Sequence, residues 1–303
     1  MTLDQHTDNT RPSSLRIWLQ AARPATLLVG VAPVLMGTAF AFHEGGFNPF
    51  TALFALLVAV FIQIGTNFAN DYFDFKKGAD THDRLGPARV TQKGWLQPDQ
   101  VKNACFLMFA LAFLSGVVLV TQTHWLLLVV GVVSILSGLA YTGGPFPLAY
   151  NGLGDLFVLV FFGPVAVVGT YYVQTHRLDI APLAGSLTIG LLATAVLVVN
   201  NLRDRITDAK ANKNTLIVRF GANFGRGLHA FCMIFPFVIT LVGVGRGTFP
   251  RICVIAMVVL PLAMREIVSV RAKDGVALNP HLGGAAKVCA LFALAFSIPL
   301  LFA

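Results

Sequence analysis

The sequence predicts an all-α polytopic membrane protein, built as a bundle of nine transmembrane helices. Of its 303 residues, 56% are hydrophobic and only 12% are charged, and the mean hydropathy is +0.73. A soluble domain usually carries about 25% charged residues, so this chain lacks the polar side chains needed to cover a globule in water. The composition therefore excludes an ordinary soluble enzyme, a disordered chain and a nucleic-acid-binding domain, although the net charge is +8.

Nine apolar segments are candidates for spans, because a helix needs about 20 apolar residues to cross the hydrocarbon layer. The polar stretch 1–22 lacks the apolar run of a signal peptide, and we expect it to form a cytoplasmic N-terminal tail. Residues 23–303 are then a single transmembrane domain. The expected spans are 25–43, 50–70, 102–121, 125–142, 153–174, 180–200, 228–245, 251–264 and 283–302.

The distribution of charge predicts how the bundle is oriented in the cell membrane. With nine spans, 19 of the 22 Lys and Arg residues fall on the side of the N-terminus and of two long loops, 71–101 and 201–227. An excess of Lys and Arg marks the cytoplasmic face. We therefore expect a cytoplasmic N-terminus, an external C-terminus and, because 12 of the 14 acids gather on the same side, an active site at the cytoplasmic face.

Two rows of polar residues begin these loops. Each row has an Asn followed four residues later by an Asp, at the predicted end of an even-numbered helix. Residues four apart share a face if the helix continues. A second Asp lies beside the first row, and another extends the second row by one turn. The two rows comprise Asn70, Asp71 and Asp74, and Asn200, Asp204 and Asp208.

Carboxylates packed together repel one another unless a cation or a proton separates them. Oxygen ligands suit hard cations, and Mg²⁺ is commonly held by one or two carboxylates together with substrate phosphates. Two facing rows therefore predict a Mg²⁺-dependent site for a diphosphate with an apolar body, because the bundle beneath is apolar. Basic side chains would contact the remaining phosphate oxygens. The candidates are Arg84, Arg89, Lys93, Arg203 and Lys213.

The same residues resemble the motifs NDxxDxxxD and DxxxD of the UbiA superfamily of intramembrane prenyltransferases. Residues 70–74 match the first five positions of the first motif, and Asp204 and Asp208 match the second motif fully. The sequence departs from the pattern at Gly78, where the motif has Asp. Asp80, two residues further on, is a candidate replacement as a metal ligand.

Within this superfamily the chain is most similar to the branch that prenylates 1,4-dihydroxy-2-naphthoate. The likeness covers about residues 23–221. It implies Mg²⁺-dependent transfer of a polyprenyl group from polyprenyl diphosphate to a carbon of the naphthoate ring, with loss of CO2, which gives a demethylmenaquinone. The stretches that carry the resemblance are 67–72 with 77–80, 84–87 with 92–94, 152–155 through 161–163, and 200–204 with 214–219.

The resemblance also implies roles for individual residues. Asp71, Asp74, Asp204 and Asp208 would bind the metal, with Asn70 and Asn200 orienting metal or phosphate.

The acceptor carboxylate needs a cationic contact, and spacing leaves Arg23, Lys93 and Arg203 open. Asp155 follows Gly154 at a predicted helix start, where it either caps the helix or forms a polar wall of the acceptor pocket.

Two alternatives remain open at this point. The first is a prenyltransferase with another aromatic acceptor, such as 4-hydroxybenzoate or homogentisate, because the diphosphate site would be unchanged. The second is a secondary transporter. Transporters often have broken helices and charges near the midplane, whereas here the charges gather at one face and the helices look continuous, which disfavours transport.

Overall fold

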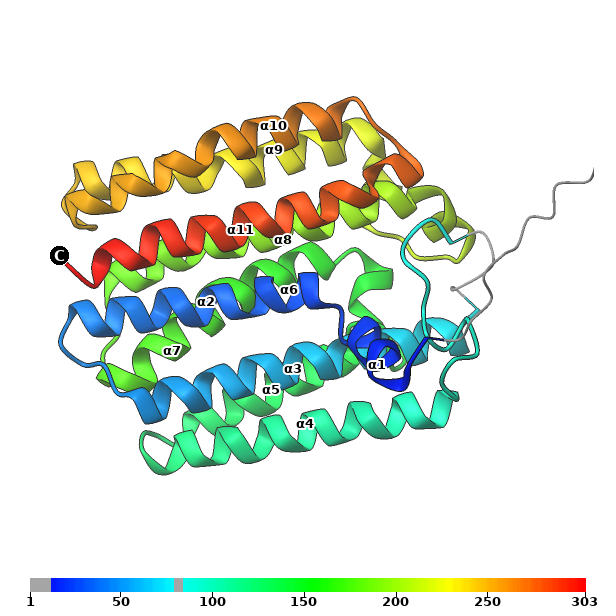
Figure 1. Ribbon diagram of the computed structural model, residues 1–303, viewed down its shortest axis with the longest axis horizontal. Coiled ribbons are helices and arrows are strands. Elements are labelled where there is room, and N and C mark those ends of the chain that lie inside the picture. Colours follow the sequence, from blue (N-terminus) through cyan, green and yellow to red (C-terminus); the bar gives the residue numbers. More distant parts are fainter. Residues whose placement is uncertain (1–11, 79–83) are drawn as a thin grey trace, which may run out of the picture.

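A computed structural model describes residues 12–78 and 84–303, so Asp80 lies outside the described residues. The long helices lie side by side (Figure 1). The α-helices are α1 (Ser14–Ala22), α2 (Pro24–His43), α3 (Pro49–Lys76), α4 (Pro98–Thr121), α5 (Leu126–Ala140), α6 (Gly154–Val160), α7 (Ala166–Thr175), α8 (Ile180–Lys210), α9 (Leu216–Gly245), α10 (Leu260–Arg271) and α11 (Asn279–Leu300).

Eight helical segments in the described part of the chain are long and apolar enough to cross a membrane. They are α2, α3, α4, α6 with α7, α8, α9, α10 with the preceding helical turns η3 (Arg251–Val259), and α11 with η4 (Gly275–Leu278). The predicted span 125–142 corresponds to α5, which has only 15 residues. The all-α polytopic fold is confirmed, while the count of nine spans stays a prediction.

Helices α3 and α8 continue well past their predicted ends. The apolar runs were expected to stop at residues 70 and 200, but the helices end at Lys76 and Lys210. Their last turns are polar in composition, yet Asp71, Asp74 and Asp204 are buried. A helix keeps residues three and four apart on one face. The two acidic rows therefore lie on helices and face the interior of the bundle.

The predicted span 153–174 is interrupted in its middle. A π-helical turn, η2 (Phe161–Val165), separates α6 from α7, and Gly163 has a non-helical backbone with φ −90° and ψ −106°. Gly163 packs against Gly190 of α8 so closely that a Cβ on Gly163 would lie 2.9 Å from the Ser186 carbonyl. Small residues allow such close helix packing in membranes. The close packing holds the interruption against α8.

Helix α1 and the segments 84–97 and 211–215 lie at the same end of the bundle (Figure 1); this end is called the charged end below. Ile17 and Ala21 of α1 are buried, with Ile17 in a core cluster that includes Phe68 of α3. Arg23 joins α1 to α2 in a left-handed conformation with φ 54°, which is uncommon for a residue other than Gly.

Candidate functional site

A cavity of about 630 Å³ runs through the bundle between α2, α3, α5, α6 with α7, and α8. Along α3 its lining extends from Ala55 to Asp74, which corresponds to roughly 28 Å of helix. This length is close to the thickness of a bilayer's hydrocarbon core. Its walls are mainly apolar, but polar side chains gather at the charged end. They include Arg23, Asn70, Asp71, Asp74, Arg84, Arg89, Asn200, Arg203 and Lys213.

Asp71 is held by neutral donors from a segment almost twenty residues further along the chain. Its carboxylate accepts hydrogen bonds from the backbone N–H groups of Val90 and Thr91, both at 3.3 Å. It also accepts a hydrogen bond from the Thr91 hydroxyl. These bonds fasten the segment after α3 onto the helix that carries the first acidic row.

Asp74 accepts two hydrogen bonds from side chains outside its own helix. The Arg89 guanidinium donates to one carboxylate oxygen at 3.2 Å, and the Tyr150 hydroxyl donates to the other at 3.0 Å. Arg89 and Asp74 are both buried. Arg89, predicted to contact phosphate, is thus an ion-pair partner of Asp74 that also lines the cavity.

The second acidic row is held by cations from its own part of the chain. Arg203 donates to both oxygens of Asp204, at 2.8 and 2.5 Å. Its guanidinium also donates to Asn200 Oδ1 at 2.7 Å and to Asn279 Oδ1 at 3.1 Å. Since only 3% of Arg203 is exposed, this network fixes the guanidinium beside the cavity.

Asp208, one turn further along α8, pairs with Lys213 at 3.3 Å. Its other carboxylate oxygen, Oδ2, is buried and has no hydrogen-bond partner within the described ranges. Burial lowers the pKa of the Lys213 ammonium, but the carboxylates of Asp208, Asp74 and Asp204 raise it more strongly, and the net effect is a pKa above the ordinary value. Carboxylates from both rows therefore lie near enough to Lys213 to raise its pKa. The two rows thus converge at the charged end.

Tyr150 connects the two rows, and nothing in the local sequence indicated this role. It lies in the short 3₁₀ helix η1 (Leu148–Asn151). Besides its bond to Asp74, its ring lies beneath the ammonium groups of Lys77, at 4.6 Å, and Lys213, at 6.0 Å. Such cation–π contacts are attractive. The Tyr150 carbonyl also accepts a hydrogen bond from the backbone of Asn214 at 3.0 Å, which joins η1 to the segment after α8.

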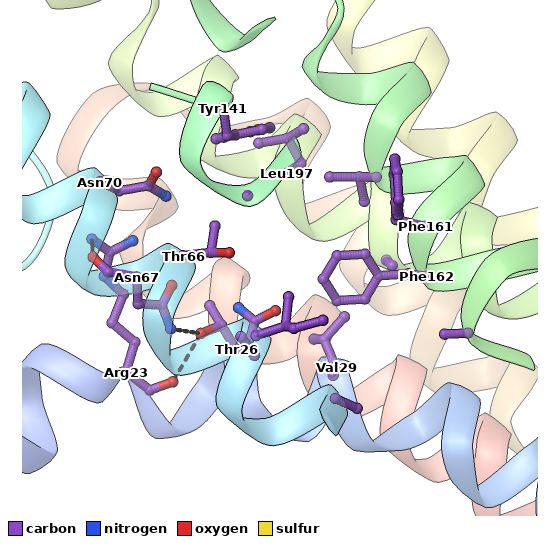
Figure 2. A pocket seen from close by; sticks show the side chains of 18 of the residues that line it. Arg23, Thr26, Val29, Thr66, Asn67, Asn70, Tyr141, Phe161, Phe162 and Leu197 are labelled. Carbon is purple, nitrogen blue, oxygen red and sulfur yellow. Dashed lines mark hydrogen bonds between the residues drawn. The ribbon is translucent and has the colours of Figure 1, made fainter. Parts of the chain in front are cut away.

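A group of polar side chains lies on one wall of the cavity, across from aromatic rings. Figure 2 shows Arg23, Asn67 and Asn70 on one side and the rings of Phe161 and Phe162 on the other. Arg23 donates to the Asn67 carbonyl at 3.3 Å. The wall therefore offers a guanidinium and amide groups opposite aromatic faces.

The remaining predicted site residues differ in whether they line the cavity. Arg84 lines the cavity and donates to the Pro87 carbonyl at 3.0 Å. Lys93 is exposed and lies outside the cavity lining. Asp155 is buried at the start of α6, and its Oδ1 lacks a hydrogen-bond partner in the described part of the chain, but it does not line the cavity.

The donor set at the charged end suits a hard cation that arrives with its substrate. Among residues 12–78 and 84–303, no three His, Cys, Asp or Glu side chains form a cluster that would hold a metal unaided. The oxygens at this end include those of four carboxylates and of nearby Asn side chains, and among the described residues one oxygen of Asp208 has no hydrogen-bond donor. Mg²⁺ commonly takes one or two protein carboxylates and completes its shell with substrate phosphates and water. These residues therefore fit Mg²⁺ carried by a diphosphate.

Fold and site together define a membrane-embedded helical protein with an acidic end to an apolar cavity. Residues 30–282 match the model of the UbiA prenyltransferase family, and the chain belongs to that family.

The chain is 43% identical to 1,4-dihydroxy-2-naphthoate octaprenyltransferase of Escherichia coli (strain K12) over 235 residues. The aligned region covers 76% of this chain and 76% of that relative. The chain is also 40% identical over 291 residues to the protein of the same name from Mycobacterium tuberculosis (strain H37Rv), covering 96% of this chain and 98% of that relative.

Solved structures show the same fold. A UbiA homolog from Aeropyrum pernix K1 matches with a TM-score of 0.72 at 11% identity, over 91% of this chain and 98% of that one. A UbiA homolog from Archaeoglobus fulgidus bound to GPP and Mg²⁺ matches with a TM-score of 0.67 at 17% identity, over 95% and 100% of the two chains.

Proposed function

We propose that this protein transfers a polyprenyl group from polyprenyl diphosphate to 1,4-dihydroxy-2-naphthoate and releases CO2, giving a demethylmenaquinol, the hydroquinone form of a demethylmenaquinone. The observation that carries this proposal is the convergence of two carboxylate rows at one end of an apolar cavity about as long as a bilayer's hydrocarbon core is thick. The names of the relatives that cover most of this chain support both substrates.

Asp71, Asp74, Asp204 and Asp208 would hold Mg²⁺ together with the diphosphate, and Asp80 is a further candidate ligand outside the described residues. When bound, Mg²⁺ supplies positive charge that stabilises the departing diphosphate.

Three basic residues would act beside the metal ligands. Arg89, Arg203 and Lys213 line the cavity next to the acids that they pair with. Their N–H groups would donate to phosphate oxygens that the metal leaves uncovered. Asn70, Asn200 and Arg84, which also line this end, would complete the headgroup pocket.

The prenyl group would react in the apolar part of the cavity. Departure of diphosphate leaves an allylic cation, which water would trap as an alcohol, so the site has to exclude water. The rings of Phe161, Phe162 and Tyr141 line this part of the cavity, and aromatic faces also stabilise positive charge.

The naphthoate ring would lie between the polar wall and these aromatic rings, with Arg23 facing its carboxylate. The ring carbon that bears the carboxylate forms a bond to the first carbon of the prenyl group. The bond to the carboxylate then breaks, CO2 departs, and the released electron pair restores the aromatic ring. The position of Arg23 on the cavity wall favours it over the exposed Lys93 as the carboxylate contact.

We also infer that the charged end faces the cytoplasm, because most Lys and Arg residues lie on that side. The N-terminus would then be inside the cell and the C-terminus outside. Labelling of single cysteines placed at residue 93 and residue 247 of a cysteine-free variant with an impermeant reagent on intact cells tests this orientation. Labelling at residue 247 alone is expected, and labelling at residue 93 alone would reverse the orientation.

The activity is tested with purified protein in lipid nanodiscs. Octaprenyl diphosphate is supplied with 1,4-dihydroxy-2-naphthoate, 4-hydroxybenzoate or homogentisate, with Mg²⁺ or with EDTA, and products are identified by mass spectrometry. Only the naphthoate with Mg²⁺ should give a prenylated, decarboxylated product. Turnover of hydroxybenzoate alone would contradict the proposed acceptor, and uptake into proteoliposomes without any product would indicate a transporter.

A further inference from the structure

Arg23 lines the cavity in a backbone conformation that its own sequence disfavours. Its φ is 54° and its ψ is 76°, in the left-handed region. Such a φ is uncommon for a residue other than Gly, and the residue before a proline, here Pro24, prefers an extended backbone. A conformation of this kind persists only where surrounding groups hold it. Groups outside the turn between α1 and α2 must therefore stabilise it.

The side-chain amide of Asn67, on α3, makes the contacts that hold this turn. Its Nδ2 group donates to the carbonyl of Ala22, the last residue of α1, and to the Thr26 hydroxyl, both at 2.9 Å. The Thr26 hydroxyl in turn donates to the Arg23 carbonyl at 2.9 Å. Figure 2 shows these bonds leading from Asn67 through Thr26 to Arg23. One amide group thus fixes the chain on both sides of Arg23.

The side chain of Arg23 contacts the same residue of α3. Its guanidinium donates to the Asn67 carbonyl at 3.3 Å, so both the backbone and the side chain of Arg23 are tied to one position. Asn67 is buried, and a buried hydrogen bond is stronger than one in water. Asn67 and Asp71 are four residues apart and share a face of α3. The helix that carries the first acidic row therefore also holds Arg23.

We propose that Asn67 and Thr26 are positioning residues for the aromatic acceptor, because they keep the Arg23 guanidinium on the cavity wall where it faces the acceptor carboxylate. This inference rests on the proposed prenyl transfer and on the role of Arg23 in it. Without the Asn67 amide or the Thr26 hydroxyl, Arg23 would relax toward the extended backbone that a following proline favours. Its guanidinium would then move away from the wall. Binding of the acceptor would weaken, and binding of the prenyl diphosphate would not.

The test removes each of the two polar groups. Thr26→Val keeps the shape of the side chain and loses the hydroxyl, and Asn67→Ala loses the amide. Both variants are assayed in nanodiscs, with octaprenyl diphosphate and 1,4-dihydroxy-2-naphthoate varied in turn. We expect KM for the naphthoate to rise by about 10-fold, as for the loss of one hydrogen bond to a charged group. KM for the octaprenyl donor and kcat should stay within about twofold, and Thr26→Ser, which retains the hydroxyl, should restore the KM of the starting protein.

Thr51→Val is the matched control. Thr51, like Thr26, is the third residue of a helix that begins with proline. Its hydroxyl also donates to the carbonyl three residues earlier, that of Asn48, at 3.1 Å. Thr51 is buried but does not line the cavity. Both KM values should be unchanged in Thr51→Val, which separates the role of Thr26 from the general cost of losing such a hydroxyl.

Arg23→Ala tests whether Thr26 acts through the Arg23 guanidinium. Residues that act through one another have effects that do not add. Thr26→Val should therefore raise KM for the naphthoate no further when it is made in the Arg23→Ala variant. A further 10-fold rise in the double variant would overturn the proposal, because Thr26 would then act independently of Arg23.

The outcomes separate this inference from the proposed function. An unchanged KM for the naphthoate in folded Thr26→Val and Asn67→Ala would overturn the positioning role while leaving prenyl transfer intact. An equal rise in KM for both substrates would also overturn it, because it would indicate general damage. If Asn67→Ala fails to fold, Thr26→Val and Thr26→Ser decide the question. Failure of the unmodified protein to prenylate any acceptor would instead remove the proposed function, and the positioning role with it.

Discussion

The two acidic rows have similar sequences but are held in place differently. Asp71 and Asp74 of α3 are bound by groups from distant segments, namely backbone N–H groups after α3, Arg89 and Tyr150. Asp204 and Asp208 of α8 pair with Arg203 and Lys213, one and five residues away. The first row therefore depends on how two connecting segments fold over it, whereas the second is largely organised by its own stretch of chain.

Loss of one acid from either row should have the largest effect on the rate of prenyl transfer. Asp74→Ala and Asp204→Ala are each expected to reduce prenyl transfer by at least about 10²-fold, because each removes a proposed metal ligand, and the metal would place positive charge against the departing diphosphate. Product formation at saturating Mg²⁺ measures this. Tryptophan fluorescence on heating checks that both variants stay folded.

Asp99→Ala is the control for the two acid variants, because Asp99 is exposed and pairs only with the nearby Lys102 in the described structure. Its activity should match that of the starting protein. Full activity in either Asp74→Ala or Asp204→Ala, with Mg²⁺ still required, would disprove the assignment of that acid.

Loss of the Tyr150 hydroxyl, which helps connect the two rows, should have the second-largest effect on prenyl transfer. Tyr150→Phe keeps the ring beneath Lys77 and Lys213 but removes the hydroxyl that donates to Asp74. We expect about a 10-fold fall in kcat/KM and a higher Mg²⁺ concentration for half-maximal rate, because Asp74 loses a donor that orients it. Tyr172→Phe, in a residue away from the cavity lining, should leave both values unchanged. An unaltered Mg²⁺ dependence in Tyr150→Phe would count against the link.

A smaller effect is expected where the loop after α3 touches the second row. A Cβ on Gly86 would lie 2.6 Å from Nη2 of Arg203, and Arg203 is already fixed by Asp204, Asn200 and Asn279. Gly86→Ala should therefore displace the guanidinium and lower kcat/KM about fivefold, less than the Tyr150 change. Gly227→Ala in α9, with no atom of the described chain near the added Cβ and no left-handed backbone, is the control, because Gly227 lies outside the cavity lining. Equal rates in the two variants would contradict the contact.

The smallest expected effect is a difference in pKa between two lysines at the charged end. Burial lowers the pKa of Lys77 below 10.5, opposed in part by Asp74, whereas the net effect of burial and the nearby carboxylates raises that of Lys213 above 10.5. As the pH rises, Lys77 should lose its proton before Lys213.

The two lysines make the free energy of unfolding depend on pH in opposite directions. Lys213 contributes stability that is present below pH 10.5 and is lost as the pH passes its raised folded-state pKa. Lys77 binds fewer protons in the folded state, so stability rises with pH between its lowered pKa and 10.5. NMR titration of ¹³C-methylated lysines, assigned with Lys77→Arg and Lys213→Arg, measures the order. A lower measured pKa for Lys213 than for Lys77 would contradict the expected order.

The sequence predicted the class of fold and the two rows because both depend on local pattern. Hydropathy identified the spans, and the four-residue spacing put the acids on one helical face. Tyr150 and Asn279 escaped prediction, because each reaches the acids only through tertiary packing, 76 residues from Asp74 and 76 from Arg203. The extension of α3 to Lys76 was also missed, since its last turns bury polar residues that no hydropathy pattern assigns to a helix.

The span 153–174 shows a similar limit. Its composition is apolar throughout, so it was expected to be one continuous helix, and only the adjacent Gly163 and Pro164 marked the place where η2 interrupts it. Pro and Gly are both tolerated within transmembrane helices. Their presence alone therefore could not distinguish a local break from an ordinary helix.

The length of α3 couples the acids to the lipid around them. Its 28 residues span roughly 42 Å, more than the hydrocarbon layer of about 30 Å, and Asp71 and Asp74 lie in the part beyond the apolar stretch. Hydrophobic mismatch is relieved by helix tilt. A thicker bilayer would therefore change how far these two acids stand from the water phase, which makes acyl-chain length of the host lipid a physical control on the headgroup site.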